Sequence, residues 1–335
     1  MDQQERIGLI RQLIDSGTEI AALDVMNVLN IDTVTLAGDF RHLIKEGEIL
    51  LVRPGVYQKR FDVRKYLAQP LALREKKSYN AEFLENYIPN KTPLWTDEEL
   101  IELQELQSNG NFGFNYRLYL EQIENFLYDI SEFCSLLDKS AYKRKDIEIY
   151  LRHGVRPDGI PFEQSYHITN FLKAFEFIRD SYEESFLMLH DFEDMSRIIC
   201  DKRIADTELG KLRSFVLELN EVAYIPLSDD NQLEKQYELS LEKLRKIQNP
   251  FEKMLFILVY ISYLLPFSDG NKELTYFMGN IPLLQSGYAP FTFYGADMTE
   301  FDIAYKALYE LSDIVILKEL ILNMYKKNIS RYTCS

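Results

Sequence analysis

The stretch from 250 to 290 decides the fold and reads PFEKMLFILVYISYLLPFSDGNKELTYFMGNIPLLQSGYAP. Its first part, from Met254 to Phe267, is almost wholly apolar but shorter than the roughly 18 residues that a membrane crossing needs. We therefore expect a helix that is buried on all sides. This helix ends at Pro266, a turn follows at Asp269-Gly270-Asn271, and a second helix begins near Lys272. Such a turn can present backbone N–H groups to an anion, and its carboxylate can hold a divalent cation, although most turns of this kind bind nothing.

The composition is that of a folded protein with two or three units. The chain has 335 residues, of which 46% are hydrophobic and 27% charged, and its formal net charge is −15. An acidic chain repels nucleic acid and anionic membranes, so any such binding must be local. The chain has an odd number of cysteines, and they are widely spaced: Cys134, Cys200 and Cys334. This spacing and the lack of an apolar secretory core in the first segment predict a reduced cytoplasmic protein with no membrane segment.

Residues 1–60 predict a small winged helix-turn-helix domain. Apolar residues recur at helical spacing in three short segments, and Asp32 is placed to cap the third. The sequence EILLVRPGVYQKR then predicts two short strands joined by a turn. The segment from Leu29 to Tyr57 resembles the winged helices of bacterial repressors and antitoxin-type regulators. The alternatives to DNA binding are a protein-interaction role and a purely structural one.

The predicted DNA contacts of this domain are few. Residues 1–60 hold seven basic and nine acidic residues, and Ala37 and Gly38 occupy positions where the resembling repressors often carry cations. We expect any duplex binding to be weak. Its candidate residues are Arg41, Lys45, Arg53, Lys59 and Arg60.

The remainder divides into a connector with a helical extension, 61–110, and a mainly helical domain, 111–332. Residues 60–79 carry six basic and two acidic residues, and their apolar side chains are expected to dock on the next domain. A capped helix is predicted near Thr96. Within the helical domain, alternation at Phe215, Leu217 and Leu219 predicts one β-hairpin over 210–227.

The loop at 265–276 resembles the signature loop of the Fic family, His-Pro-Phe-x-Asp/Glu-Gly-Asn-Gly-Arg-x-x-Arg. The segments NPFEKMLFILVYISYLLPFSDGNK and GNIPLLQSGYAPFTF resemble a branch with Gln-Pro-Phe-x-Asp-x-Asn-Lys-Arg-x-x-Arg and a following Asn-Ile-Pro-Leu helix. Further similarity lies in RFDVRKYLAQPL, YNAEFLENYIPNKT, GKLR and KALYELSDIVILKELI. The resemblance covers about 60–332, and a winged helix is a common companion in this branch.

The resemblance implies a Fic fold, a helical bundle with a β-hairpin flap, and the transfer of AMP from ATP to a hydroxyl of a target protein. The implied cofactors are Mg²⁺, held by Asp269, and ATP, whose phosphates would meet Asp269, Gly270, Asn271 and Lys272. The implied target-binding flap contains Gly210, Arg213, Phe215 and Leu217.

The chain departs from the family pattern at the residues that carry the chemistry. Leu265 stands where the proton-accepting histidine is expected, and Glu273 and Tyr276 stand at the two arginine positions. A carboxylate in place of an arginine adds repulsion of several kcal/mol beside a triphosphate. The inhibitory motif of the family, Ser-x-x-x-Glu-Gly/Asn, best matches 139–144, with Lys139 and Lys143 at the serine and glutamate positions. Glu273 and Lys143 would then form a reversed ion pair or lie apart as surface residues.

The sequence favours a catalytically inactive, regulatory or interaction protein whose partner is another protein, with a homodimer also possible. One alternative is an active nucleotide or phosphate-ester transferase that uses Asp269, Asn271 and Lys272 with a non-standard base. Another is a winged-helix DNA-binding regulator. His153 and His167 have no partners at ligand spacing, so no metal site is expected on them, and His190 is expected to be a core histidine and not a base.

Overall fold

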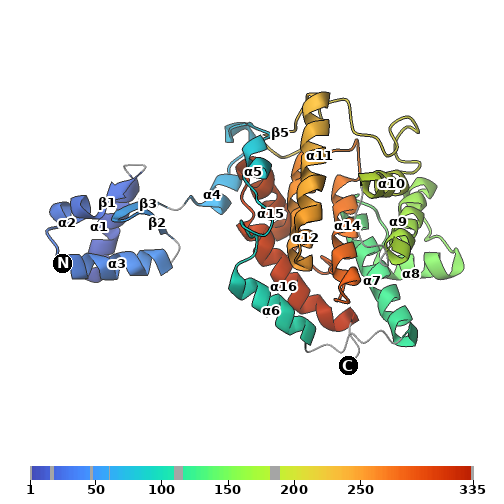
Figure 1. Ribbon diagram of the computed structural model, residues 1–335, viewed down its shortest axis with the longest axis horizontal. Helices are drawn as coiled ribbons and strands as arrows, with labels where there is room; N and C mark the ends of the chain where they lie inside the picture. Colours follow the sequence, from blue (N-terminus) through green and yellow to red (C-terminus); the bar gives the residue numbers. More distant parts are fainter. Residues whose placement is uncertain are drawn as a thin grey trace. The chain divides into compact units, whose positions relative to one another are not determined.

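The structure is a computed structural model and describes residues 2–15, 19–45, 48–59, 61–108, 116–181 and 189–332. The chain divides into two compact units, Met1–Ala68 and Gln69–Ser335 (Figure 1). The connector predicted over 61–110 is divided between these units, because the boundary lies between Ala68 and Gln69. No helix in the described part of the chain combines the length and the apolar character that a membrane crossing requires.

The described part of the first unit contains three helices, α1 to α3, around an apolar core, a small antiparallel sheet with the order β1-β3-β2, and a short helix α4 after the sheet. Its elements are α1 (Gln3–Asp15), β1 (Ile20–Ala21), α2 (Ala22–Leu29), α3 (Thr33–Lys45), β2 (Ile49–Arg53), β3 (Val56–Lys59) and α4 (Val63–Leu67). Asp32 Oδ1 accepts a hydrogen bond from Thr35 N at 2.8 Å, which confirms the predicted cap of α3. The elements follow the predicted order, and the identification of this unit as a winged helix stays a prediction.

The outer face of α3 is largely apolar or small. Val34 is 79% exposed, and a Cβ on Gly38 would meet nothing within 4 Å. Arg41 is exposed, but its Nε donates to Ala37 O at 3.1 Å on the same helix. Lys59 is exposed on β3. Of the other predicted DNA contacts, Arg60 and the side chains of Lys45 and Arg53 lie outside the described part.

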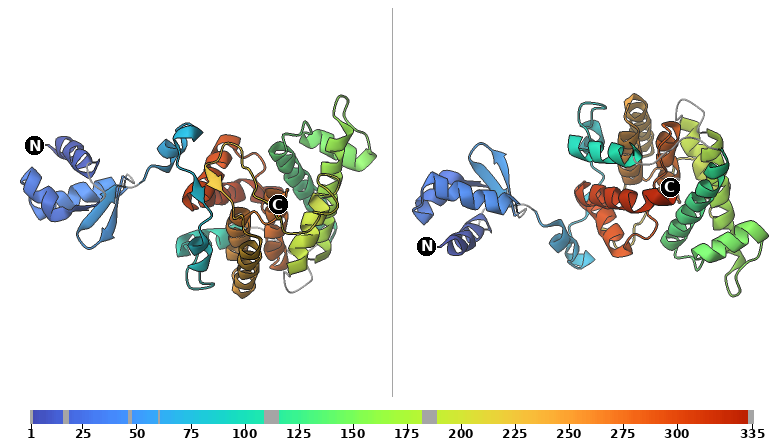
Figure 2. Two further views of the ribbon diagram at one scale, coloured as in Figure 1. Left: turned by 90° about the horizontal axis from the view of Figure 1, so that it is seen from above. Right: turned by 90° about the horizontal axis from the view of Figure 1, so that it is seen from below.

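The second unit is a helical bundle built around α12, α13 and α14 (Figures 1 and 2). Its first elements are η1 (Leu71–Leu73), β4 (Lys77–Ser78), α5 (Ala81–Glu85), α6 (Asp97–Ser108), α7 (Tyr116–Leu137), α8 (Arg144–His153), α9 (Phe162–Ser181) and α10 (Leu189–Ile199). They are followed by β5 (Tyr224–Ile225), α11 (Asp230–Lys246), α12 (Pro250–Phe256), the π-helical turn η2 (Ile257–Ile261), α13 (Ser262–Leu264), α14 (Asn271–Gln285), α15 (Met298–Leu311) and α16 (Val315–Tyr332).

The continuous helix α12–η2–α13 lies at the centre, as the apolar run predicts. Asn249 caps it by accepting from Phe251 N at 2.9 Å, and all residues from Phe251 to Phe267 except Lys253 are buried. α14 packs along this helix, and α9 and α10 cover the other side of α14. The loop between α13 and α14 is therefore held among buried elements on both sides.

The connector docks on this bundle through buried polar contacts. Arg74 Nη1 bonds Glu310 Oε1 at 2.5 Å on α15, so Arg74 is a packing residue and not part of a basic surface. The buried carboxylate of Glu252 accepts from Tyr87 Oη at 3.0 Å and from Leu94 N at 2.8 Å. These contacts explain why the segment before α6 belongs to the same compact unit.

The hairpin predicted over 210–227 does not form as a ladder within that segment. Leu212 instead makes an antiparallel bridge with Phe267, and β5 pairs in parallel with β4. The reason lies in Arg213, which is buried and donates from its backbone N to Pro266 O at 3.0 Å and from Nε to Leu265 O at 2.7 Å. Because the segment bonds to the α13–α14 loop, it does not fold back on itself. The exposed Phe215 and the half-buried Leu217 lie in irregular chain beyond this contact.

We predict that the first unit binds duplex DNA weakly and without sequence preference, because the described face of α3 offers few cations to the phosphates. This binding should disappear at physiological salt concentration. Fluorescence anisotropy of a labelled duplex over a salt series measures this. Arg41→Gln with Lys59→Gln should weaken the remaining binding further, whereas Lys235→Gln on α11 should not change it. Tight binding of one sequence with a steep salt slope would contradict the prediction.

Candidate functional site

The loop between α13 and α14 is closed by its own hydrogen bonds. The side chain of Asn271 accepts from Phe267 N at 2.9 Å and donates to Phe267 O at 2.8 Å. Asp269 Oδ1 accepts from Gly270 N at 2.8 Å. Gly270 has φ +69°, and a Cβ there would lie 2.8 Å from Cys200 Sγ, so no larger residue fits. The loop has a fixed shape because its turn residues bond and pack against their neighbours.

Leu265 occupies the position where the resemblance expects a proton acceptor. It is buried, and its φ of +51° is one that side chains with a Cβ rarely adopt, at a cost of about 1 kcal/mol. Its side chain has no atom that can take a proton. The position therefore contributes hydrocarbon packing and one backbone carbonyl, which Arg213 binds.

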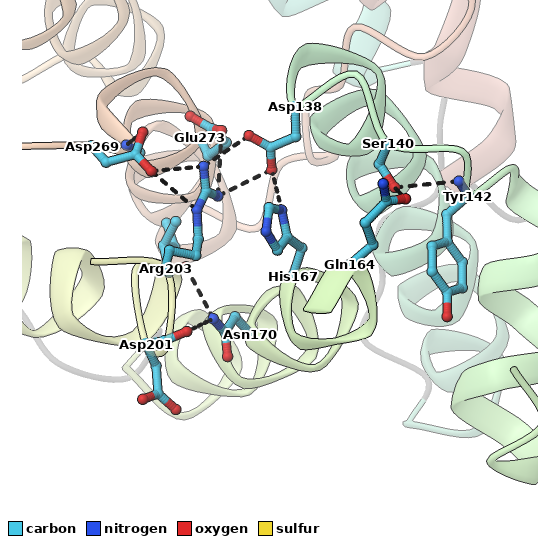
Figure 3. Close-up of polar contacts among 12 residues, drawn as sticks. Asp138, Ser140, Tyr142, Gln164, His167, Asn170, Asp201, Arg203, Asp269 and Glu273 are labelled. Carbon is cyan, nitrogen blue, oxygen red and sulfur yellow. Dashed lines mark hydrogen bonds and ion pairs between the residues drawn. The ribbon is translucent and has the colours of Figure 1, made fainter. Parts of the chain in front are cut away.

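The guanidinium of Arg203 lies at the centre of the site (Figure 3). Its side chain is 7% exposed and binds the Asp138 carboxylate with two N–H groups, at 3.0 and 2.8 Å. It also contacts Asp269 Oδ2 from Nη2 at 3.0 Å and from Nε at 3.2 Å. Glu273 Oε1 lies 3.7 Å from Nη1. The loop carboxylate at Asp269 thus has a cation partner from this chain.

The protonation of this cluster follows from burial. Burial, and then the negative charge of Asp138, raise the pKa of Glu273 to about 8, although Arg203 acts against this. Burial also disfavours the ionised form of Asp138, but His167, Arg203 and a hydrogen bond from Glu273 outweigh it and hold the pKa of Asp138 below its ordinary value. Below its pKa, Glu273 is a neutral acid that donates to Asp138, and the formal ion pairs of Arg203 are with Asp138 and Asp269.

The cluster is anchored from α9. His167 Nδ1 lies 2.7 Å from Asp138 Oδ2. Asn170 Nδ2 donates to the carbonyls of Ile199 and Asp201, at 3.1 and 2.8 Å, and so holds the turn that carries Arg203 (Figure 3). We call Asp138, His167, Arg203, Asp269 and Glu273 the Arg203 cluster.

Lys272, a predicted phosphate contact, is engaged elsewhere. Its Nζ lies 4.9 Å from the ring centroid of Tyr305 and 5.8 Å from those of Phe301 and Tyr309. Burial lowers the pKa of this lysine. Tyr276, at the second arginine position, is buried with its ring against neighbouring aromatic residues.

The structure does not form the reversed pair between Glu273 and Lys143. Residues 138–143 are a turn between α7 and α8 and not a helix, and Lys139 and Lys143 are both exposed. The cation that faces Glu273 is Arg203. Asp138 and Arg203 were not predicted as site residues, because nothing in their local sequence marks them. His167 was considered only as a metal ligand, and its contact with Asp138 was not predicted.

The residues present do not fit Mg²⁺ and ATP. Leu265 cannot act as a base, Glu273 supplies a carboxyl group where phosphates need a cation, and Asp269 is bound to Arg203. Among the described residues, no group of three or more His, Cys, Asp or Glu side chains is arranged to hold a metal ion.

We predict that Glu273→Gln stabilises the protein at alkaline pH. The pKa of Glu273 is raised on folding, so the folded state holds a proton that the unfolded state releases, and stability falls as pH rises from about 4.5 towards 8. Glutamine keeps a neutral donor to Asp138 and removes this dependence, which should add on the order of 2 kcal/mol at pH 8 and much less at pH 5.

Urea unfolding of both proteins at pH 5 and pH 8 measures the difference. Glu242→Gln, an exposed exchange of the same type on α11, is the matched control and should not show it. Equal changes at both pH values would mean that Glu273 is ionised in the folded protein.

Comparison with solved structures finds the Fic-domain fold. A fragment of Fic-1 from C. elegans matches with a TM-score of 0.60 and 16% identity, over 70% of this chain and 71% of that one. A Fic family protein from Desulfovibrio desulfuricans G20 matches at 0.58 and 14%, over 73% and 76%. A Fic domain containing signaling protein from Bacteroides thetaiotaomicron VPI-5482 matches at 0.55 and 13%, over 70% and 93%. The sequence matches no model of a protein family and no curated protein sequence. This mainly helical chain therefore has the Fic fold.

Proposed function

We propose that this protein is a member of the Fic family that has lost nucleotide transfer and acts by binding another protein. The observation that carries the proposal is the contact between Arg203 and Asp269. By the resemblance, Asp269 is the residue that would hold Mg²⁺. Here its carboxylate is neutralised by a cation of the same chain, which leaves it poorly suited to a second cation.

The contact between Arg203 and Asp269 should weaken the binding of a metal ion to Asp269. Removing one partner of a buried ion pair typically costs about 3 to 5 kcal/mol. If Mg²⁺ displaced Arg203 from Asp269, part of this cost would be set against metal binding, and each 1.4 kcal/mol weakens affinity about tenfold. The cost is at the low end of this range, because the side chain of Asp269 is 44% exposed and Arg203 would keep its two hydrogen bonds to Asp138.

The other groups that transfer requires are also engaged or replaced. Loss of a positioned base costs about 10² to 10⁴ in rate, and Leu265 supplies none. The alternative enzyme would need Asn271 and Lys272, but the carboxamide of Asn271 closes the loop and Lys272 lies against three aromatic rings. These contacts favour an interaction protein over a transferase with a non-standard base.

We predict that the purified protein, incubated with labelled ATP and Mg²⁺, labels neither itself nor proteins of a cell lysate above background. A thermal-shift series with ATP, GTP, CDP-choline and UTP plus Mg²⁺ should give no stabilisation, because a ligand that binds the folded state would raise the melting temperature.

Asp269→Asn is the control for both measurements, because it removes the one loop carboxylate that could hold the metal. The proposal would be wrong if the unchanged protein labelled a target and Asp269→Asn abolished that labelling. The alternative of an active transferase would then be favoured. A nucleotide-dependent thermal shift that survives the substitution would point to a nucleotide site away from the loop and would also contradict the proposal.

A further inference from the structure

An exposed row of cations and aromatic rings runs along the second unit beside the Arg203 cluster. Arg156 Cζ lies 5.3 Å from the ring centroid of Phe162. Phe162 and Tyr166 are in edge-to-face contact with their centroids 5.0 Å apart. Lys202 Nζ lies 4.5 Å from the centroid of Tyr166. We call these four residues the cation–ring row.

The row combines accessible apolar area with accessible charge. Phe162 is 54% exposed, and Val155, which precedes Arg156 in the sequence, is 56% exposed. Arg156 and Lys202 are exposed as well, and no carboxylate among the described residues forms an ion pair with either of them. Large exposed apolar side chains beside unpaired cations are typical of surfaces that bind a partner.

The local charge opposes that of the whole chain. Residues 139–166, which span Arg156, Phe162 and Tyr166, hold six basic and four acidic residues, a net of +2, whereas the full chain has a net charge of −15. Two of these cations are paired, Arg144 with Glu148 at 2.9 Å and Arg152 with Glu124 at 2.7 Å. Lys139 and Lys143 are exposed, and the turn that carries them bonds Gln164, which lies between Phe162 and Tyr166 on α9.

Two residues of the row lie on backbone that the Arg203 cluster holds in place. Tyr166 precedes His167, which bonds Asp138, and Lys202 precedes Arg203, so neighbouring residues face outward to the row and inward to the Arg203 cluster. Lys202 has φ +61°, a left-handed conformation that residues with a Cβ rarely adopt. A surface whose side chains are already ordered loses less entropy on binding.

We propose that the cation–ring row docks an acidic segment of a partner protein, with carboxylates against Arg156 and Lys202 and an apolar side chain against Phe162. A short acidic peptide matches a small positive surface on an acidic protein, whereas a long nucleic acid would meet the repulsion of the remaining surface. The inference rests on the proposed binding role and names the chemistry of the partner.

The test uses the full chain and a labelled peptide in which Glu pairs alternate with Leu, measured by fluorescence anisotropy at low and physiological salt. We expect binding that weakens with salt because both contacts are charged. Arg156→Gln with Lys202→Gln should raise Kd about tenfold, since each exposed charge pair contributes up to about 1 kcal/mol. Phe162→Ser should also weaken binding, by loss of apolar contact.

Lys235→Gln with Arg245→Gln removes the same charge from exposed positions of α11 and should leave Kd nearly unchanged. Absence of peptide binding, or equal binding of a peptide with Gln in place of Glu, would overturn the proposal. So would tighter binding of a single-stranded oligonucleotide through the same residues, or self-association that the row variants abolish. Nucleotide transfer, by contrast, would contradict only the proposed function, since peptide binding is measured without nucleotide.

Discussion

The buried guanidinium of Arg203 is the constraint on which the site depends. A guanidinium does not lose its proton in proteins, so at 7% exposure its charge must be met by neighbouring groups. Asp138 at the end of α7 and Asp269 on the loop meet it directly. Glu273 contributes a carboxyl group whose pKa burial and Asp138 raise to about 8, so that it is protonated at neutral pH. The loop, α7 and α14 are thus held together around one positive charge.

This constraint also explains the course of the chain around the site. Arg203 reaches the cluster from a turn that follows α10, and Asn170 on α9 holds that turn by its carbonyls. Cys200 Sγ donates to Asp269 O at 3.3 Å, so the end of α10 contacts the loop a second time. The short distances leave room only for glycine at Gly270. A change in the conformation of the loop would therefore shift the packing of α9 and α10.

Sequence reasoning predicted what is encoded locally and missed what depends on distant partners. The apolar run before Pro266, the turn at Asp269 and the cap at Asp32 were visible because each is a pattern within a few residues. Arg203 and Asp269 lie 66 positions apart, and no local signal joins them. The alternation around Phe215 suggested a hairpin, but strand pairing depends on the partner available, and Arg213 binds this segment to loop carbonyls.

The match of Asp269-Gly270-Asn271 to the family loop has a structural explanation that needs no nucleotide. Asn271 closes the loop through both its carboxamide atoms, and Gly270 is required by its positive φ and by Cys200. Asp269 bonds the next backbone N–H and neutralises Arg203. Each of the three matching residues is thus fixed by folding. At the positions where the resemblance expects a base and two arginines, the chain has Leu265, Glu273 and Tyr276. Each residue that matches the loop therefore has a role in folding, and this supports the proposed loss of transfer.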